Sequence, residues 1–160
     1  MSESRELPDR AALIAELNAV LRDVSGQGVL FSEAAAALLG VNSTDLEVLG
    51  YLADGPMTAG ALAQATGLTT GAVTGVVDRL ERAGYARRER DADDRRKVMV
   101  RVTEAAVARS SPIFQPMEQA VKAALSDYAD DDLRLLLSFL RRMQRVGSAV
   151  LARLNAGPRG

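Results

Sequence analysis

Between residues 57 and 84 the apolar positions follow the period of two short helices separated by a turn. Gly67 is placed to end the first helix, Thr69 or Thr70 to cap the second, and Gly84 to end it. The apolar positions are Ala61, Leu62 and Ala65 in the first helix and Val73, Val76, Val77 and Leu80 in the second. At helical spacing, the opposite, outward face of the second helix carries Thr70, Gly71, Thr74, Gly75, Asp78 and Arg79. The pattern predicts a helix-turn-helix whose second helix has a polar face.

Two β-prone runs follow in the segment YARRERDADDRRKVMVRVT. Val98, Val100 and Val102 alternate with Met99 and Arg101, and this period of two fits a half-buried strand. The turn from Asp91 to Arg96 holds only charged or small residues, so we expect it to project into solvent or onto a polyanion. A helix-turn-helix followed by such a hairpin is typical of a winged-helix module.

Both ends of the chain carry long amphipathic stripes, which a winged-helix module does not need. The stripes are Leu13, Ile14, Leu17, Val20, Leu21 and Val24, and Leu133, Leu136, Leu137, Leu140, Met143, Val146, Val150, Leu151 and Leu154. The second stripe covers about 22 residues, or roughly 33 Å of helix. This surplus apolar surface favours a helical interface between two copies over a single intramolecular hairpin. The candidate interface residues are Leu13, Leu17, Leu136, Leu140, Met143 and Val150.

These patterns predict a mainly α fold with a small β-hairpin wing. A winged helix-turn-helix domain is expected at residues 41–104, between an N-terminal helical dimerisation segment at 1–40 and C-terminal linker and dimerisation helices at 105–160. The linker is expected as a helix from about Glu104 to Tyr128, and Pro112 and Pro116 can kink it.

Charge is concentrated in the segment that carries the expected hairpin. Residues 79–101 include nine basic and five acidic side chains, a local charge of +4, whereas the whole chain of 160 residues carries −1 and the remainder therefore −5. An acidic chain can still bind nucleic acid, because phosphate contacts need only one basic face. A solvated charged hairpin is the alternative, and the preceding helix-turn-helix favours DNA.

The absence of Cys and His excludes several classes of chemistry. Disulfides, thiol redox sensing, thiolate or imidazole metal sites, and Ser-His or Cys-His catalysis all need one of these residues. Asp130, Asp131 and Asp132 precede an apolar stripe, which favours an N-cap and first-turn acids over a catalytic or calcium-binding role. The sequence therefore predicts no enzyme, no metal site and no cofactor.

No run of apolar residues reaches the roughly 20 needed to span a membrane, and the acidic N-terminus lacks the basic-then-apolar order of a signal peptide. We expect a soluble, cytoplasmic protein with no membrane partner.

Residues 43–104 resemble the MarR family of bacterial winged-helix transcription regulators. The family pattern has a recognition helix ending in D-R-L-E-x-x-G, a wing with D-x-R, and a strand closing in L-T or V-T. These motifs fall on Asp78, Arg79, Leu80, Glu81 and Gly84, on Asp94 and Arg96, and on Val102 and Thr103. The ordered set covers about 60 residues, and the flanking helices extend the likeness over nearly the whole chain with less specificity.

The resemblance implies how DNA is contacted. Arg96 would enter the minor groove, where a planar and permanently charged guanidinium suits the narrow negative slot. Asp94 would orient the wing by pairing with an arginine. Thr70 and Thr74 are the best candidates for base or phosphate contacts from the recognition helix. The full candidate set for DNA binding is Thr69, Thr70, Gly71, Thr74, Gly75, Arg79, Arg95, Arg96 and Lys97.

Two glycines in the expected recognition helix depart from the family pattern. Relatives often have a basic or polar residue where this chain has Gly75, and Gly71 lies one turn earlier. Each costs about 1 kcal/mol relative to Ala in an exposed helix. The glycines allow close backbone approach to DNA, or they reflect tolerance at an exposed site, and the sequence leaves both interpretations open.

The resemblance implies a homodimer that binds double-stranded, pseudo-palindromic operator DNA and regulates transcription, most often as a repressor. A small aromatic or anionic effector would bind between the lobes, where Phe31, Tyr51, Phe114 and Met117 are candidate lining residues; the alternative is that they are ordinary core. The alternative function is a winged-helix module that binds another protein.

Overall fold

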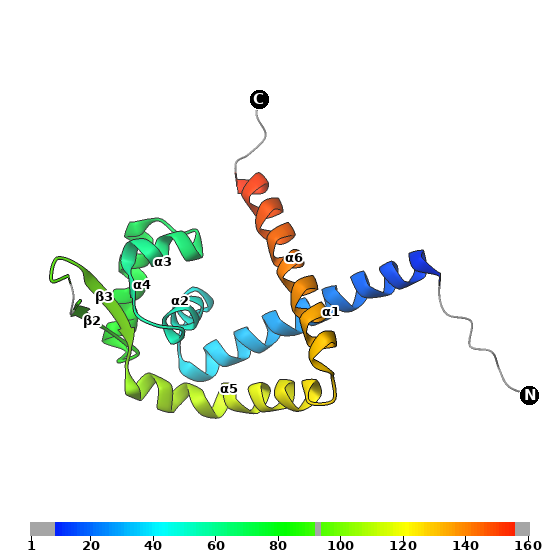
Figure 1. Ribbon diagram of the computed structural model, residues 1–160. Coiled ribbons are helices and arrows are strands. Elements are labelled where there is room, and N and C mark those ends of the chain that lie inside the picture. Colours follow the sequence, from blue (N-terminus) through cyan, green and yellow to red (C-terminus); the bar gives the residue numbers. More distant parts are fainter. Residues whose placement is uncertain (1–8, 92–93, 156–160) are drawn as a thin grey trace, which may run out of the picture. The chain divides into compact units, whose positions relative to one another are not determined.

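The computed structural model describes residues 9–91 and 94–155. Helices predominate, and the described residues divide into two compact units with the boundary between Ile113 and Phe114. Six helices and three short strands lie in the described part of the chain. A two-residue strand precedes the third helix, and the other two strands lie between the fourth helix and the fifth. The expected mainly α fold with a small β hairpin is confirmed (Figure 1).

The first unit begins with a long helix, α1 (Arg10–Leu39). Asp9 provides the N-cap, since its Oδ1 accepts a 2.7 Å hydrogen bond from the N–H of Ala12. The helix ends at Gly40, whose φ of 67° lies in the left-handed region. Only the last turns of α1 are buried, through Ala35, Ala36 and Leu39, so most of its apolar stripe stays exposed within this single chain.

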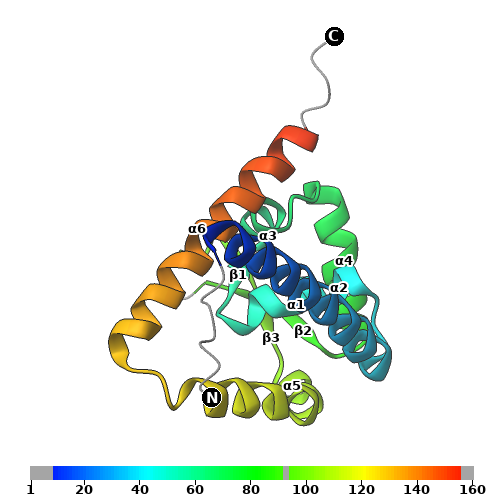
Figure 2. The same cartoon turned by 90° about the vertical axis from the view of Figure 1, so that its right-hand side faces the viewer.

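The helix-turn-helix consists of α3 (Ala59–Thr66) and α4 (Thr70–Arg82), preceded by α2 (Ser43–Ala53). Of the two candidate caps, Thr69 is the N-cap of α4. The expected apolar face of α4 forms the centre of the core: Val73, Val76, Val77 and Leu80 are at most 2% exposed. Leu62 of α3 and Val48 and Leu52 of α2 also belong to this core. Helices α2, α3 and α4 pack against one small sheet (Figure 2).

That sheet has three antiparallel strands in the order β1-β3-β2. The expected hairpin is formed by β2 (Ala86–Arg90) and β3 (Val98–Val102), with Arg88 opposite Val100. On the face that the three valines share, Val100 is 1% exposed and Val102 is half-buried, as the period of two predicts. Val98, at the end of β3 nearest the wing tip, was expected on the same half-buried face but is 49% exposed. Strand β1 (Met57–Thr58) was not predicted, because two residues are too few to show a period. It pairs with β3, with Met57 opposite Val100.

Helix α5 (Glu104–Leu125) starts in the first unit, and the boundary between the units falls between Pro112 and Pro116. It ends at Leu125, three residues before the expected Tyr128, because a turn follows in which Tyr128 donates its N–H to the oxygen of Leu125. Helix α6 (Asp130–Asn155) has all three aspartates in its first turn, which confirms the expected first-turn acids. None of them is the expected N-cap, because Asp130 is already the first residue of the helix.

No single helix within residues 9–91 and 94–155 is long and apolar enough to cross a membrane. The pair α1 and α2, bent by 95°, is the one combination there that meets the test of length and composition.

Candidate nucleic-acid interface

The outward face of α4 presents two hydroxyl groups beyond the N-cap. The Oγ1 of Thr69 is occupied by the cap, since it accepts a 3.2 Å hydrogen bond from the N–H of Ala72. Thr70 and Thr74 are exposed, and the hydroxyl of Thr74 donates to the main-chain oxygen of Thr70 at 2.9 Å. Because that bond uses its proton, Thr74 offers mainly lone pairs and a methyl group to a ligand.

Neither glycine on this face is required by packing within the described chain. A methyl group on Gly71 would meet nothing within 4 Å, and one on Gly75 would lie 3.8 Å from Nη1 of Arg79, an ordinary contact. The helical backbone also imposes no positive φ at either position. The described chain therefore gives no steric or conformational reason for a glycine at either position.

Arg79, expected to face outward, is bound to a carboxylate of α2. Its Nη2 lies 2.6 Å from Oδ1 of Asp45, and its Nε lies 3.2 Å from both carboxylate oxygens. Asp45 is only 4% exposed and is the buried charged residue of the described core. The hydrogen bond to Asp45 raises the pKa of the Arg79 guanidinium. Asp45 was not among the predicted site residues, because its partner lies 34 residues away and no local motif marks the pair.

The remaining acids of the D-R-L-E motif hold the wing against α4. Arg88 of β2 donates its backbone N–H to Oε1 of Glu81 at 2.7 Å, and its guanidinium contacts Oε2 of the same residue. The guanidinium also lies 2.8 Å from Oδ1 of Asp78. Asp78 and Glu81 thus connect β2 to the C-terminal half of α4.

Gly84 and Thr103, two further motif residues, lie at the two ends of the hairpin. Gly84 has a φ of 75°, which lets the chain turn from α4 into β2. The hydroxyl of Thr103 donates to the main-chain oxygen of Gly84 at 2.7 Å and accepts from the N–H of Ala106 at 3.0 Å. One threonine therefore closes the hairpin and caps the start of α5.

The wing tip is ordered by two aspartates. Asp91 accepts from the N–H of Asp94 at 2.9 Å, and Asp94 accepts from the N–H of Arg96 at 3.1 Å. The Nε of Arg96 lies 3.4 Å from Asp94 Oδ1, and Nζ of Lys97 lies 3.9 Å from Oδ2. The side chain of Arg96 is nevertheless 93% exposed. The arginine with which Asp94 pairs is therefore Arg96. Ala92 and Asp93 of the expected tip lie outside the described residues.

On the strands, Glu89 neutralises part of the basic charge by pairing with two arginines. Glu89 lies 2.5 Å from Arg101 and 3.4 Å from Arg87. The hydrogen bond from Arg101, with a smaller contribution from Arg87, lowers the pKa of Glu89. Within the part of the chain that the structure describes, Arg90 and Arg95 have no ion-pair partner. Together with the almost fully exposed Arg96, they leave positive charge available to a ligand near the wing tip.

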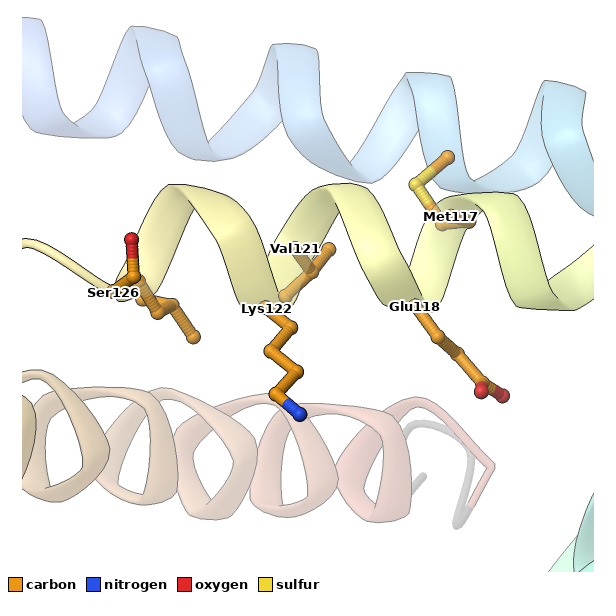
Figure 3. A pocket seen from close by; sticks show the side chains of 6 residues that line it. Met117, Glu118, Val121, Lys122 and Ser126 are labelled. Atoms are coloured by element: carbon orange, nitrogen blue, oxygen red, sulfur yellow. The ribbon is translucent and has the colours of Figure 1, made fainter.

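A shallow, mainly apolar groove runs along α5 in the second unit. It is lined by Met117, Glu118, Val121, Lys122, Leu125 and Ser126. Glu118 and Lys122 project from one side of α5 and Met117 from the other (Figure 3). Of the four candidate pocket residues, Met117 lines this groove. Phe31, Tyr51 and Phe114 are half-buried elsewhere, and the hydroxyl of Tyr51 joins α2 to α3 by donating to the oxygen of Ala65 at 3.1 Å.

The candidate interface residues keep much of their apolar surface exposed within one chain. Leu13, Leu17, Leu140 and Val150 are about half exposed, Leu136 is 37% exposed, and Met143 is half-buried. Such exposure would be costly for a long apolar stripe in water. Among residues 9–91 and 94–155, no three acidic side chains gather in a way that could hold a metal ion.

A sequence model described as "MarR family" matches residues 39–97. An "Uncharacterized HTH-type transcriptional regulator YcgE" of Bacillus subtilis (strain 168) is 39% identical over 136 residues, which cover 84% of this chain and 88% of that protein. Among solved structures, a MarR family protein from Bacillus stearothermophilus has a TM-score of 0.62 and 20% identity, covering 88% of this chain and 99% of its own. A MepR mutant from S. aureus bound to an oligodeoxyribonucleotide has a TM-score of 0.54 and 18% identity, covering 81% and 96%.

Proposed function

Because the chain belongs to the MarR family of DNA-binding transcription regulators, which are not enzymes, we propose that it is a homodimeric repressor acting on pseudo-palindromic operator DNA. A regulator of this kind works where the bacterial chromosome lies, in the cytoplasm.

One observation carries this proposal: a hydroxyl-bearing helix face and an arginine-tipped wing belong to the same compact unit. Thr70 and Thr74 are exposed on α4, and Arg96 is almost fully exposed at the wing. The helix reads base edges in the major groove, while the wing guanidinium enters the minor groove. The proposed contact set is Thr69, Thr70, Gly71, Thr74, Gly75, Arg95, Arg96 and Lys97, with Arg79 held on the same helix by Asp45.

The homodimer is supported by the exposed stripes of α1 and α6 in the segments expected to dimerise, residues 1–40 and 105–160. Leu140 and Val150 on α6, and Leu13 and Leu17 on α1, are covered when two copies pack through these helices. Two copies then place two α4 helices in successive major grooves, about 34 Å apart, which makes the operator a pseudo-palindrome.

Release from DNA would follow binding of a small aromatic or anionic ligand. The groove on α5 supports this proposal, since Met117, Val121 and Leu125 offer apolar surface and Lys122 a positive charge. The ligand must bind one arrangement of the two DNA-binding units better than the other, because equal affinity for both shifts nothing.

The test is footprinting of the purified protein on upstream DNA, together with its mass in solution by analytical ultracentrifugation. We expect a dimer that protects two half-sites related by a pseudo-dyad, and an affinity that falls steeply with salt because phosphate contacts release counterions. Transcription from the protected promoter should rise when the regulator is omitted. A monomer, a single protected half-site or higher transcription with the regulator present would contradict, respectively, the dimer, the palindrome or repression.

A further inference from the structure

The ion pair between Asp45 and Arg79 points to a role that the DNA-contacting residues do not cover. Asp45 is 4% exposed, and a carboxylate removed from water in this way is stable only when its charge is matched and its oxygens are hydrogen-bonded. Arg79 supplies both, through Nε and Nη2. Asp45 sits in the first turn of α2, where its N–H bonds to Oδ1 of Asn42, so the carboxylate is held on a capped helix.

The pair constrains α4 in a way that its apolar contacts do not. Val73, Val76, Val77 and Leu80 bury one side of the helix, but apolar burial has no preferred direction. Hydrogen bonds from a planar guanidinium to a carboxylate, in contrast, have a preferred direction. Arg79 lies on the same helix as Thr70 and Thr74, one turn after Gly75. Holding its guanidinium therefore restricts the rotation of α4 and with it the direction of the two hydroxyls.

The same pairing changes what Arg79 contributes toward DNA. Its side chain is 43% exposed, and Nη1 lies toward Gly75 on the outward face. The guanidinium charge is nonetheless balanced by Asp45 at 2.6 Å. A phosphate contact releases counterions only when it neutralises phosphate with net positive charge. A balanced pair makes little contribution of that kind, unlike the almost fully exposed Arg96.

We infer that Asp45 is a positioning residue for DNA recognition, and that Arg79 is its internal partner rather than a phosphate contact. The inference rests on the proposed function, since it concerns how α4 is presented to operator DNA. In this view the buried carboxylate of Asp45, outside the helix-turn-helix, contributes to sequence specificity. The phosphate contacts that make affinity depend on salt come from the wing.

The decisive variant is the double substitution Asp45→Asn with Arg79→Gln. It removes both charges together, so the net charge is unchanged and no unpaired charge is left in the core. We expect the slope of log affinity against log salt to match that of the wild-type protein. Operator affinity should fall on the order of tenfold, with affinity for an unrelated duplex unchanged. As a positive control, Arg96→Gln should reduce the slope by about 0.9 for each protomer.

The single substitution Asp45→Asn provides a second readout with the opposite sign. It frees the charge of Arg79, so affinity for an unrelated duplex should rise and its salt slope should steepen. Glu47→Gln is the matched control, because it removes the same charge from an exposed position of the same helix. Asp45→Asn should steepen the slope more than this control. If Asp45→Asn does not fold, the charge-neutral double variant alone decides.

Two results separate this inference from the proposed function. If the wild-type protein binds operator DNA and the double variant loses about 0.9 of slope per protomer, Arg79 is a phosphate contact and the inference fails alone. An unchanged ratio of operator to unrelated-duplex affinity in the double variant likewise removes the positioning role. A wild-type protein that binds no duplex DNA overturns the proposed function, and this inference with it.

Discussion

The hydroxyl of Tyr85 donates a 2.6 Å hydrogen bond to the main-chain oxygen of Leu39, and both residues are buried. Leu39 is the last residue of α1, and Tyr85 immediately precedes β2. The guanidinium of Arg109, on α5, lies 5.3 Å from the centre of the same ring. One side chain therefore ties the end of the N-terminal helix, the start of the wing and the first turns of α5.

Tyr85→Phe keeps the ring and removes this bond, which leaves a buried carbonyl oxygen without its partner. We expect the free energy of unfolding to fall by about 1 to 3 kcal/mol, measured by urea denaturation. Tyr128→Phe is the control, because Tyr128 is half exposed, and it should change stability little. Equal effects of the two substitutions would show that the bond to Leu39 contributes no stability.

Gly75→Ala tests whether the glycine on the outward face of α4 is needed for close approach of the backbone to DNA. The added methyl group meets nothing closer than 3.8 Å, so the helix should gain about 1 kcal/mol of stability. Operator affinity then separates the two interpretations: a fall despite greater stability means that the backbone approaches DNA closely, and no change means tolerance at an exposed site. Gly71→Ala, also free of steric conflict, is the companion variant nearer the N-cap. A loss of stability in Gly75→Ala would contradict the steric argument.

Arg96→Ala should weaken operator binding by about 1 to 3 kcal/mol per half-site without lowering thermal stability. The reason is its place at the wing, where the side chain is 93% exposed and its link to Asp94 is a long, solvent-screened one at 3.4 Å. Fluorescence anisotropy with labelled operator measures the change. Affinity equal to that of the wild-type protein at physiological salt would remove Arg96 from the contact set.

Leu140→Asp places a carboxylate on the exposed apolar stripe of α6. In a monomer the change is harmless because Leu140 is 55% exposed, whereas in the proposed dimer it buries an unpaired charge at a cost of several kcal/mol. We expect a monomer in analytical ultracentrifugation and loss of tight full-operator binding. Ser138→Asp adds the same charge at an exposed position nearly opposite on α6 and should remain dimeric. A monodisperse monomer that still binds the full operator tightly would refute the dimer.

Glu89→Gln removes a carboxylate whose pKa in the folded state is lowered, first by the hydrogen bond from Arg101. A lowered folded-state pKa means that the stabilisation is fully present above the unfolded-state pKa of about 4.3 and is lost as the pH falls through the folded-state value. The wild-type protein should therefore exceed the variant in unfolding free energy at pH 7, and the difference should shrink as the pH falls below about 4. A difference that stays constant between pH 7 and pH 3 would show that the pairing with Arg101 does not stabilise the wing.

Much of this molecule could be predicted from local pattern. The helical period of Val73, Val76, Val77 and Leu80 predicted the buried face of α4, and the alternation around Val100 predicted β3. Period and capping residues are local properties, because both follow from the repeat of one backbone conformation. The MarR motifs could be located for the same reason, since each is a short run of neighbouring residues.

Only the tertiary structure decided which charges meet. The sequence placed Asp78 and Arg79 on an outward face, but it contains nothing that pairs Arg79 with Asp45, or Asp78 and Glu81 with Arg88. The same holds for β1, whose two residues become a strand only because Val100 and Met99 lie beside them. A hydrophobic pattern reports which side of an element is buried, because burial repeats with the backbone period. The partner of a charged side chain depends instead on how separate elements pack, and that determines which arginines of this basic segment remain available to DNA.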